Sequence, residues 1–145
     1  MSLQFHASGR PLHALLLLRL GVAVLIGAHA YSRVYHGSVG EFGVYLSSQG
    51  MPFGTALAWC VTLTEIAGTL CLASGRWIRY AVLAHTCIIT AGIEMVHARE
   101  GWFVVGGGRN GVEFSLSLLL ALFAIWLLSP QPLPSSPSKA RMRGQ

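Results

Sequence analysis

The sequence predicts an all-α fold, an integral membrane bundle of four helices, from three observations. Of the 145 residues, 53% are hydrophobic and only 10% are charged, far below the roughly 25% charged residues of soluble domains. Five carboxylate and ten basic side chains are too few to cover a soluble globule of this length. The mean hydropathy is +0.58, and four stretches each have about the twenty apolar residues that cross a hydrocarbon core. Lipid is therefore the solvent for most of the chain.

The predicted spans are 12–31, 53–73, 77–97 and 111–129. Backbone groups in lipid must pair within their own segment, so each span is expected to be a helix, and LLLLRLGVAVLIG lacks the alternation of a strand. The first span ends in Ala28-His29-Ala30, which is also the pattern of a secretory cleavage site. Because Arg19 interrupts the apolar region and the stretch is long enough to cross, we expect it to stay uncleaved.

Three segments lie outside the spans. Residues 1–11 are predicted to be a cytoplasmic N-terminus. Residues 32–52 are too polar to cross, but Phe42, Tyr45 and Leu46 stand at helical spacing, so this segment is either a short helix on the outer interface or an irregular loop. Residues 130–145 hold four prolines and three serines. They cannot bury enough apolar area to fold, which predicts a disordered basic cytoplasmic tail.

The distribution of Lys and Arg sets the predicted topology. An even number of spans leaves both termini on one side, and an excess of basic residues marks the cytoplasmic side. The termini and the connection at 74–76 hold six basic residues, counting Arg79 just inside the third span, whereas the other two connections hold three. Both termini are therefore predicted to be cytoplasmic. Trp77 and Tyr80 suit the aromatic belt of that interface.

Ionisable side chains inside a span are expensive and mark candidate sites. Six are candidates here: Arg19, His29, Glu65, Glu94, His97 and Glu113. Arg19 and Glu65 both lie on the order of 10 to 12 Å from the cytoplasmic ends of their spans, which suggests an ion pair. Alternatively, Arg19 extends to the inner head groups. Glu65 shares a helical face with small residues that allow close helix contact, namely Gly54, Ala58, Thr62 and Gly68.

Glu94, His97, Glu113 and His29 form a second predicted polar layer near the outer surface. The stripe Thr86, Thr90, Glu94, His97 and the stripe Glu113, Ser117, Ala121, Ala124 are both expected to face the interior. His85 lies about 180° from Glu94 on its helix, so it is expected to face lipid or a neighbouring helix.

The chemistry of this layer has two interpretations. Glu94-x-x-His97 resembles half of the ligand set of di-metal bundles, but only one such pair is present, and we predict no metal site. A hydrogen-bonded or proton-labile cluster suits proton uptake or contact with a quinone head group. Nucleic acid is not an expected partner, because the basic residues are scattered between apolar runs.

The order and spacing of several short motifs over residues 14–129 resemble the DoxX family of small bacterial four-helix membrane proteins. The Pro-rich tail departs from the usual family ending. The motifs are Arg19-Leu-Gly21, Arg33, Gln49-Gly50-Met51-Pro52, Glu65-Ile-Ala-Gly68, Gly75-Arg76-Trp-Ile-Arg79, His97 with Gly101-Trp102-Phe103, and Gly108-Arg109-Asn110-Gly111-Val-Glu113.

The resemblance implies a multi-pass protein of the bacterial inner membrane with largely undefined activity. Some relatives are similar to membrane subunits of thiosulfate:quinone oxidoreductase, and others associate with redox enzymes. We expect an accessory or anchoring subunit of a membrane redox system, not an enzyme on its own. Its expected partners are membrane lipid and a redox enzyme or a second copy.

Two alternatives remain open. In a quinone-reactive subunit, Arg19 or His97 would contact the head group, and Glu65 or Glu113 would handle protons. In a small-molecule or proton carrier, a path would join the two polar layers. No cofactor is evident from the residues, although a quinone is possible, and no catalytic residue is assigned.

Overall fold

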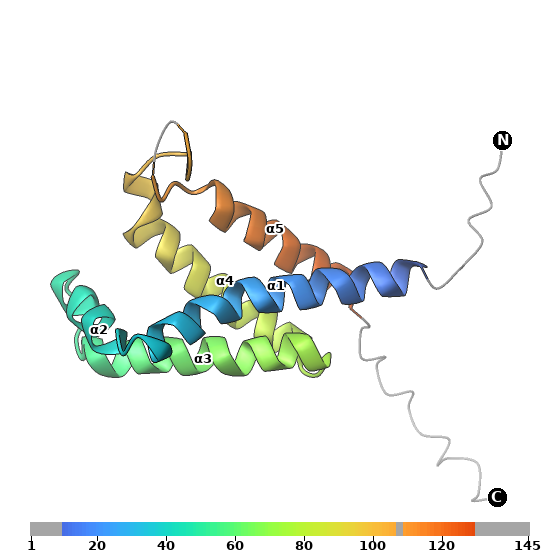
Figure 1. The fold of residues 1–145 in the computed structure, drawn as a ribbon, viewed down its shortest axis with the longest axis horizontal. Coiled ribbons are helices and arrows are strands. Elements are labelled where there is room, and N and C mark those ends of the chain that lie inside the picture. The colour runs from blue at the N-terminus through green and yellow to red at the C-terminus, as the bar shows by residue number, and fades with distance from the viewer. Residues whose placement is uncertain (1–9, 107–108, 130–145) are drawn as a thin grey trace, which may run out of the picture.

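The computed structural model describes residues 10–106 and 109–129 (Figure 1). The fold is all-α, as predicted. The predicted tail and most of the predicted N-terminus lie outside the described residues. The elements are α1 (Arg10–Tyr35), α2 (Val39–Ser48), α3 (Gly54–Ser74), α4 (Ile78–Met95), the short 3-10 helix η1 (His97–Arg99) and α5 (Glu113–Leu128).

Among the described residues, three helices are long and apolar enough to cross a membrane, at Pro11–Tyr35, Gly54–Ser74 and Ile78–Arg99. The fourth predicted span corresponds to α5, which is apolar but has only 16 residues. At 1.5 Å per residue it rises about 24 Å, compared with a hydrocarbon core of about 30 Å. α5 is shorter than predicted because the chain before Glu113 forms a turn. α1 instead continues four residues beyond the predicted end, to Tyr35.

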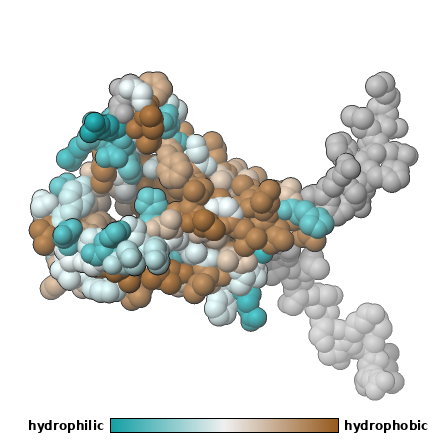
Figure 2. All heavy atoms as spheres, viewed as in Figure 1, coloured by the Kyte–Doolittle hydropathy of each residue, from teal (hydrophilic) through white to brown (hydrophobic). Residues whose placement is uncertain are grey.

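The four long helices form a ring of contacts, in which α1 packs on α3, α3 on α4, α4 on α5, and α5 on α1. α1 and α3 lie side by side, and the first turns of α1 project beyond the end of α3 (Figure 1). The α4 and α5 pair diverges from them toward the end that holds α2 and η1. Figure 2 shows the largest group of hydrophilic residues at that end and hydrophobic residues over most of the remaining visible face, with smaller hydrophilic groups at the opposite end and the lower edge.

The hydrophobic core fills the closed end of the ring. Leu72, Leu122 and Ile125 are fully buried there. They come from α3 and α5, and they pack with side chains of α1 and α4, including Val22 and Val82. Because lipid already solvates the outer faces, this interlocking of side chains supplies van der Waals attraction that the bilayer alone would not give.

The segment predicted as either a short helix or a loop is a helix, α2. It packs closely on the start of α3 because two glycines face each other. A methyl group added at Gly43 would lie 2.6 Å from Cα of Thr55, and one at Gly54 would overlap the Gly43 carbonyl oxygen. The Tyr45 hydroxyl donates a hydrogen bond of 3.1 Å to the Met95 carbonyl. α2 therefore connects the start of α3 to the end of α4.

The chain between η1 and α5 folds back onto itself. The backbone N–H groups of Gly111, Val112 and Glu113 donate hydrogen bonds of 3.1 to 3.2 Å to carbonyls of residues 101–103. These bonds satisfy N–H groups at the start of α5 that have no partner within the helix. A side chain at Gly111 would overlap the Trp102 and Phe103 backbone, so the close approach requires glycine.

Candidate functional site

A cavity of about 600 Å³ lies between the diverging helices, toward the end that holds α2. All five α-helices contribute to its wall. The lining is mainly apolar and includes Ile26, Leu57, Ile89 and Leu118. The ionisable and aromatic polar side chains in the wall are those of His29, Arg33, Tyr45, Glu65, Cys87 and His97.

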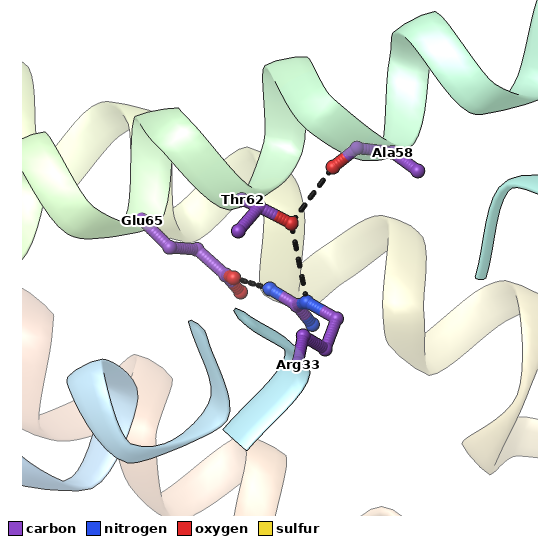
Figure 3. A network of polar contacts seen from close by, with 4 residues as sticks. All are labelled: Arg33, Ala58, Thr62 and Glu65. Carbon is purple, nitrogen blue, oxygen red and sulfur yellow. Dashed lines mark hydrogen bonds and ion pairs between the residues drawn. The ribbon is translucent and has the colours of Figure 1, made fainter. Parts of the chain in front are cut away.

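One wall carries a charged network between α1 and α3 (Figure 3). Arg33, in the last turn of α1, forms an ion pair with Glu65. Its Nε donates a hydrogen bond of 3.3 Å to the Thr62 hydroxyl, which in turn donates one of 2.8 Å to the Ala58 carbonyl. The guanidinium also lies 5.1 Å from the centre of the Phe42 ring. The side chains of Arg33 and Glu65 are 20% and 8% exposed, so the ion pair is largely buried.

The predicted Arg19–Glu65 pair is wrong, because Glu65 pairs with Arg33. The Arg19 guanidinium lies against Gly75 at the end of α3, with both terminal nitrogens 2.8 Å from the position of a Cβ there. Glu65 precedes Gly75 by ten residues, or about 15 Å of helix. The predicted depths are equal only if the start of α1 is level with the end of α3, because the two helices run in opposite directions. The first turns of α1 project beyond α3, which moves Arg19 to the end of the bundle and Arg33 to the level of the carboxylate.

Glu94 also departs from the prediction. It is exposed and outside the cavity wall, and Thr90 of the same stripe is exposed. α4 instead buries Ile78, Ala81, Val82 and His85. The His85 ring is 1% exposed and lies against Gly68, where α3 has no side chain. Its Nδ1 donates a hydrogen bond of 2.7 Å to the Ala81 carbonyl. The gap at Gly68 therefore decides which face of α4 turns inward.

The predicted inward stripe of α5 is displaced in the same way. α5 buries Ser115, Leu118, Leu122 and Ile125, whereas Ser117 is exposed. Glu113 is half-buried and lies outside the cavity wall. Its carboxylate accepts a hydrogen bond of 2.9 Å from the Val104 N–H. Because it stands in the first turn of α5, the helix dipole also stabilises its charge, and its carboxylate contacts the folded-back segment rather than the cavity.

His29 and His97 do line the cavity. Nδ1 of His97 lies 2.5 Å from the Asn110 carbonyl and donates to it, which fixes the ring at the η1 end of the wall. Of the six candidates, the cavity thus brings together His29, Glu65 and His97. The predicted span ends before Arg33, so Arg33 is not predicted as a partner for Glu65. Its position one helical turn after His29 is the signal that places it on the same face of α1.

Apolar helices long enough to cross a membrane, arranged around a cavity with one charged wall, define a multi-pass membrane protein with a pocket between its helices. The family model described as DoxX matches residues 14–98. Since this match covers more than half of the chain, the protein belongs to the DoxX family. The matched range includes Arg33 and Glu65 and ends within η1, so the motifs quoted at 101–113 lie beyond it. No curated protein and no solved structure matches the chain.

Proposed function

We propose that this protein is a ligand-holding accessory subunit of a membrane redox system, and that its cavity holds one small, mainly apolar molecule with a polar head group, of the quinone class. The supporting observation is the cavity. Its volume of about 600 Å³ falls within the range of roughly 300–1,000 Å³ typical of small-molecule sites. Its apolar lining and its few convergent polar side chains also fit such sites.

The polar wall suits a carbonyl-bearing head group. A guanidinium has five N–H donors in a planar fork. The contacts to Thr62 and Glu65 engage Nε and Nη2 of Arg33, which leaves Nη1 to donate to a carbonyl oxygen in the cavity. His29 and His97 also line the cavity and can bind a second oxygen atom of the head group. Ile89, Phe114 and Leu118 offer the apolar part of the ligand a matching surface.

We favour an accessory role because the charged groups of the wall are already engaged. Arg33 pairs with Glu65, and His97 is bonded to a backbone carbonyl, so a bound molecule meets a neutralised wall. The carrier alternative needs a polar path that joins the layer of Arg19 and Glu65 to the second polar layer near His29 and His97. Glu65 already shares the cavity with His29 and His97, so the missing part of the path is the one that leads to Arg19. The fully buried cluster of Leu72, Leu122 and Ile125 belongs to the dry core at the Arg19 end of the bundle, and we do not favour that alternative.

The proposal includes a topology. α5 crosses the bilayer as a fourth span, both termini lie on the side of the α3–α4 turn, and this side is the cytoplasmic face of a bacterial inner membrane. The start of α1 and the ends of α3 and α5 point to one end of the bundle (Figure 1). Local thinning of the bilayer can accommodate a short span. Reporter fusions after residue 145 and between residues 100 and 106 test this; reporters on the same side would contradict it.

Ligand binding is tested with two glycine variants. Gly92 lines the cavity, and a Cβ added there meets nothing within 4 Å, so Gly92→Leu fills the cavity. Gly21 is an exposed helical glycine outside the wall with equal free space, so Gly21→Leu is the matched control. We expect the wild-type protein in uncharged detergent to bind decylubiquinone with 1:1 stoichiometry by equilibrium dialysis. Binding should weaken at least about tenfold, or 1.4 kcal/mol, in Gly92→Leu only.

The absence of saturable decylubiquinone binding, or an equal loss of affinity in both variants, would refute the proposal that the cavity binds a quinone. The accessory role is tested by cross-linking in native membranes followed by affinity capture. We expect a redox enzyme to be recovered with the protein. Recovery of a homo-oligomer alone, with an unchanged quinone redox state after deletion, would refute this part of the proposal.

A further inference from the structure

The carboxylates of the chain are concentrated in one half of the bundle, whereas arginines occur at both ends. Four of the five carboxylates belong to the half that holds α2 and η1, at Glu41, Glu94, Glu100 and Glu113. The fifth, Glu65, is engaged by Arg33. The opposite end holds Arg19, Arg76 and Arg79 around the α3–α4 turn; we call this set the arginine cluster. Acidic side chains of the chain are therefore placed away from the arginine cluster.

Arg19 is half-buried over the end of α3, with its guanidinium against Gly75. The negative end of the α3 dipole favours a cation at this place. Its Nε is nevertheless buried and, within the described residues, has no hydrogen-bond partner. A buried donor without a partner costs free energy. Because the Arg19 side chain as a whole is only half-buried, an anion beside the guanidinium would offset this cost through its charge.

Arg79, on the next helix, also has a buried Nε without a hydrogen-bond partner among the described residues. It is half-buried in the first turn of α4, and its guanidinium lies 5.4 Å from the centre of the Trp126 ring. Arg76, in the turn before it, is exposed. Gly75 and Trp77 have φ of 77° and 53°, which turns the chain sharply and keeps both arginines at the end of α3.

The surroundings of the arginine cluster are those of a membrane interface. Trp77 and Tyr80 are 71% and 74% exposed, and such aromatic side chains favour the head-group level. Leu12 and Leu16, on the first turns of α1, are exposed as well. A molecule that binds here thus meets cations beside apolar surface.

We propose that the arginine cluster binds the phosphate head group of an anionic phospholipid in the leaflet next to the α3–α4 turn. Guanidinium groups match phosphate oxygens in geometry and charge. A lipid phosphate is the anion available at this depth, and its acyl chains extend along the exposed leucines of α1. This inference is independent of the quinone proposal, because the arginine cluster lies outside the cavity wall.

Native mass spectrometry of the delipidated full chain tests the proposal, with phosphatidylglycerol and phosphatidylcholine of identical acyl chains as probes. Phosphatidylglycerol is expected to bind at least about tenfold more tightly. Arg19→Gln should weaken it about tenfold, equivalent to one charge-assisted hydrogen bond, and leave phosphatidylcholine unchanged. Arg99→Gln is the matched control, since it removes the same charge from an exposed position at the opposite end.

If Arg19→Gln fails to fold, Arg76→Gln at an exposed position provides the same test. Equal binding of the two lipids, or an equal effect of Arg99→Gln, would overturn the proposal. Competition distinguishes the source of the phosphate. Displacement of the lipid by inorganic phosphate at similar affinity would show a site for a soluble anion and would also overturn it, whereas resistance to displacement supports a lipid site.

Discussion

The Arg33–Glu65 ion pair offers the sharpest test of how α1 is fixed on α3. Removing one partner of a fully buried pair costs about 3–5 kcal/mol, because the other charge is left unpaired. Here the Glu65 side chain is 8% exposed, while Arg33 is 20% exposed and borders the cavity. Water in the cavity can hydrate the remaining guanidinium in part, so we expect Glu65→Leu to lower the free energy of unfolding by about 2–3 kcal/mol.

The double variant should behave differently from the sum of its parts. Arg33→Met with Glu65→Leu removes both charges and keeps similar side-chain volumes, so its loss should stay within about 1 kcal/mol. Each single variant should lose about 2 kcal/mol or more, which gives a coupling energy of at least about 3 kcal/mol. Unfolding in mixed micelles with increasing dodecyl sulfate, followed by circular dichroism, measures all four proteins. Additive losses would refute the claim that the two charges stabilise each other.

The remaining predictions concern helix contacts. Gly54→Ala should destabilise the protein by about 1–3 kcal/mol because the methyl overlaps the α2 backbone. Unfolding in dodecyl sulfate measures this loss, and Gly40→Ala, whose added methyl has free space, is the control. Gly68→Ala pushes into the His85 ring, so its cost should vanish in a His85→Ala background, and a persistent cost would refute this contact. Tyr45→Phe should lose about 1 kcal/mol and accelerate hydrogen exchange in α2; unchanged exchange would show that the bond does not hold α2.

Much of the helical arrangement could be predicted from the sequence. The apolar lengths indicate the helices, because in lipid a backbone segment must satisfy its own polar groups. The inward face of α3 could be predicted as well, since it combines small residues with an ionisable one. The buried positions Ala58, Thr62, Glu65 and Gly68 belong to that face. The spacing of Phe42, Tyr45 and Leu46 indicated the helix at α2 as one of two options.

The sequence by itself thus determined the class of fold, the medium that surrounds it and the inward position of Glu65. Only the tertiary structure decided which arginine meets Glu65, because the register between α1 and α3 depends on how far α1 projects. It also decided that His85 rather than Glu94 turns inward. α4 carries apolar residues on every side, and when lipid solvates its outer face, periodicity cannot distinguish the outside from the inside. The inward face is instead selected by shape, through the space at Gly68 that accepts the His85 ring.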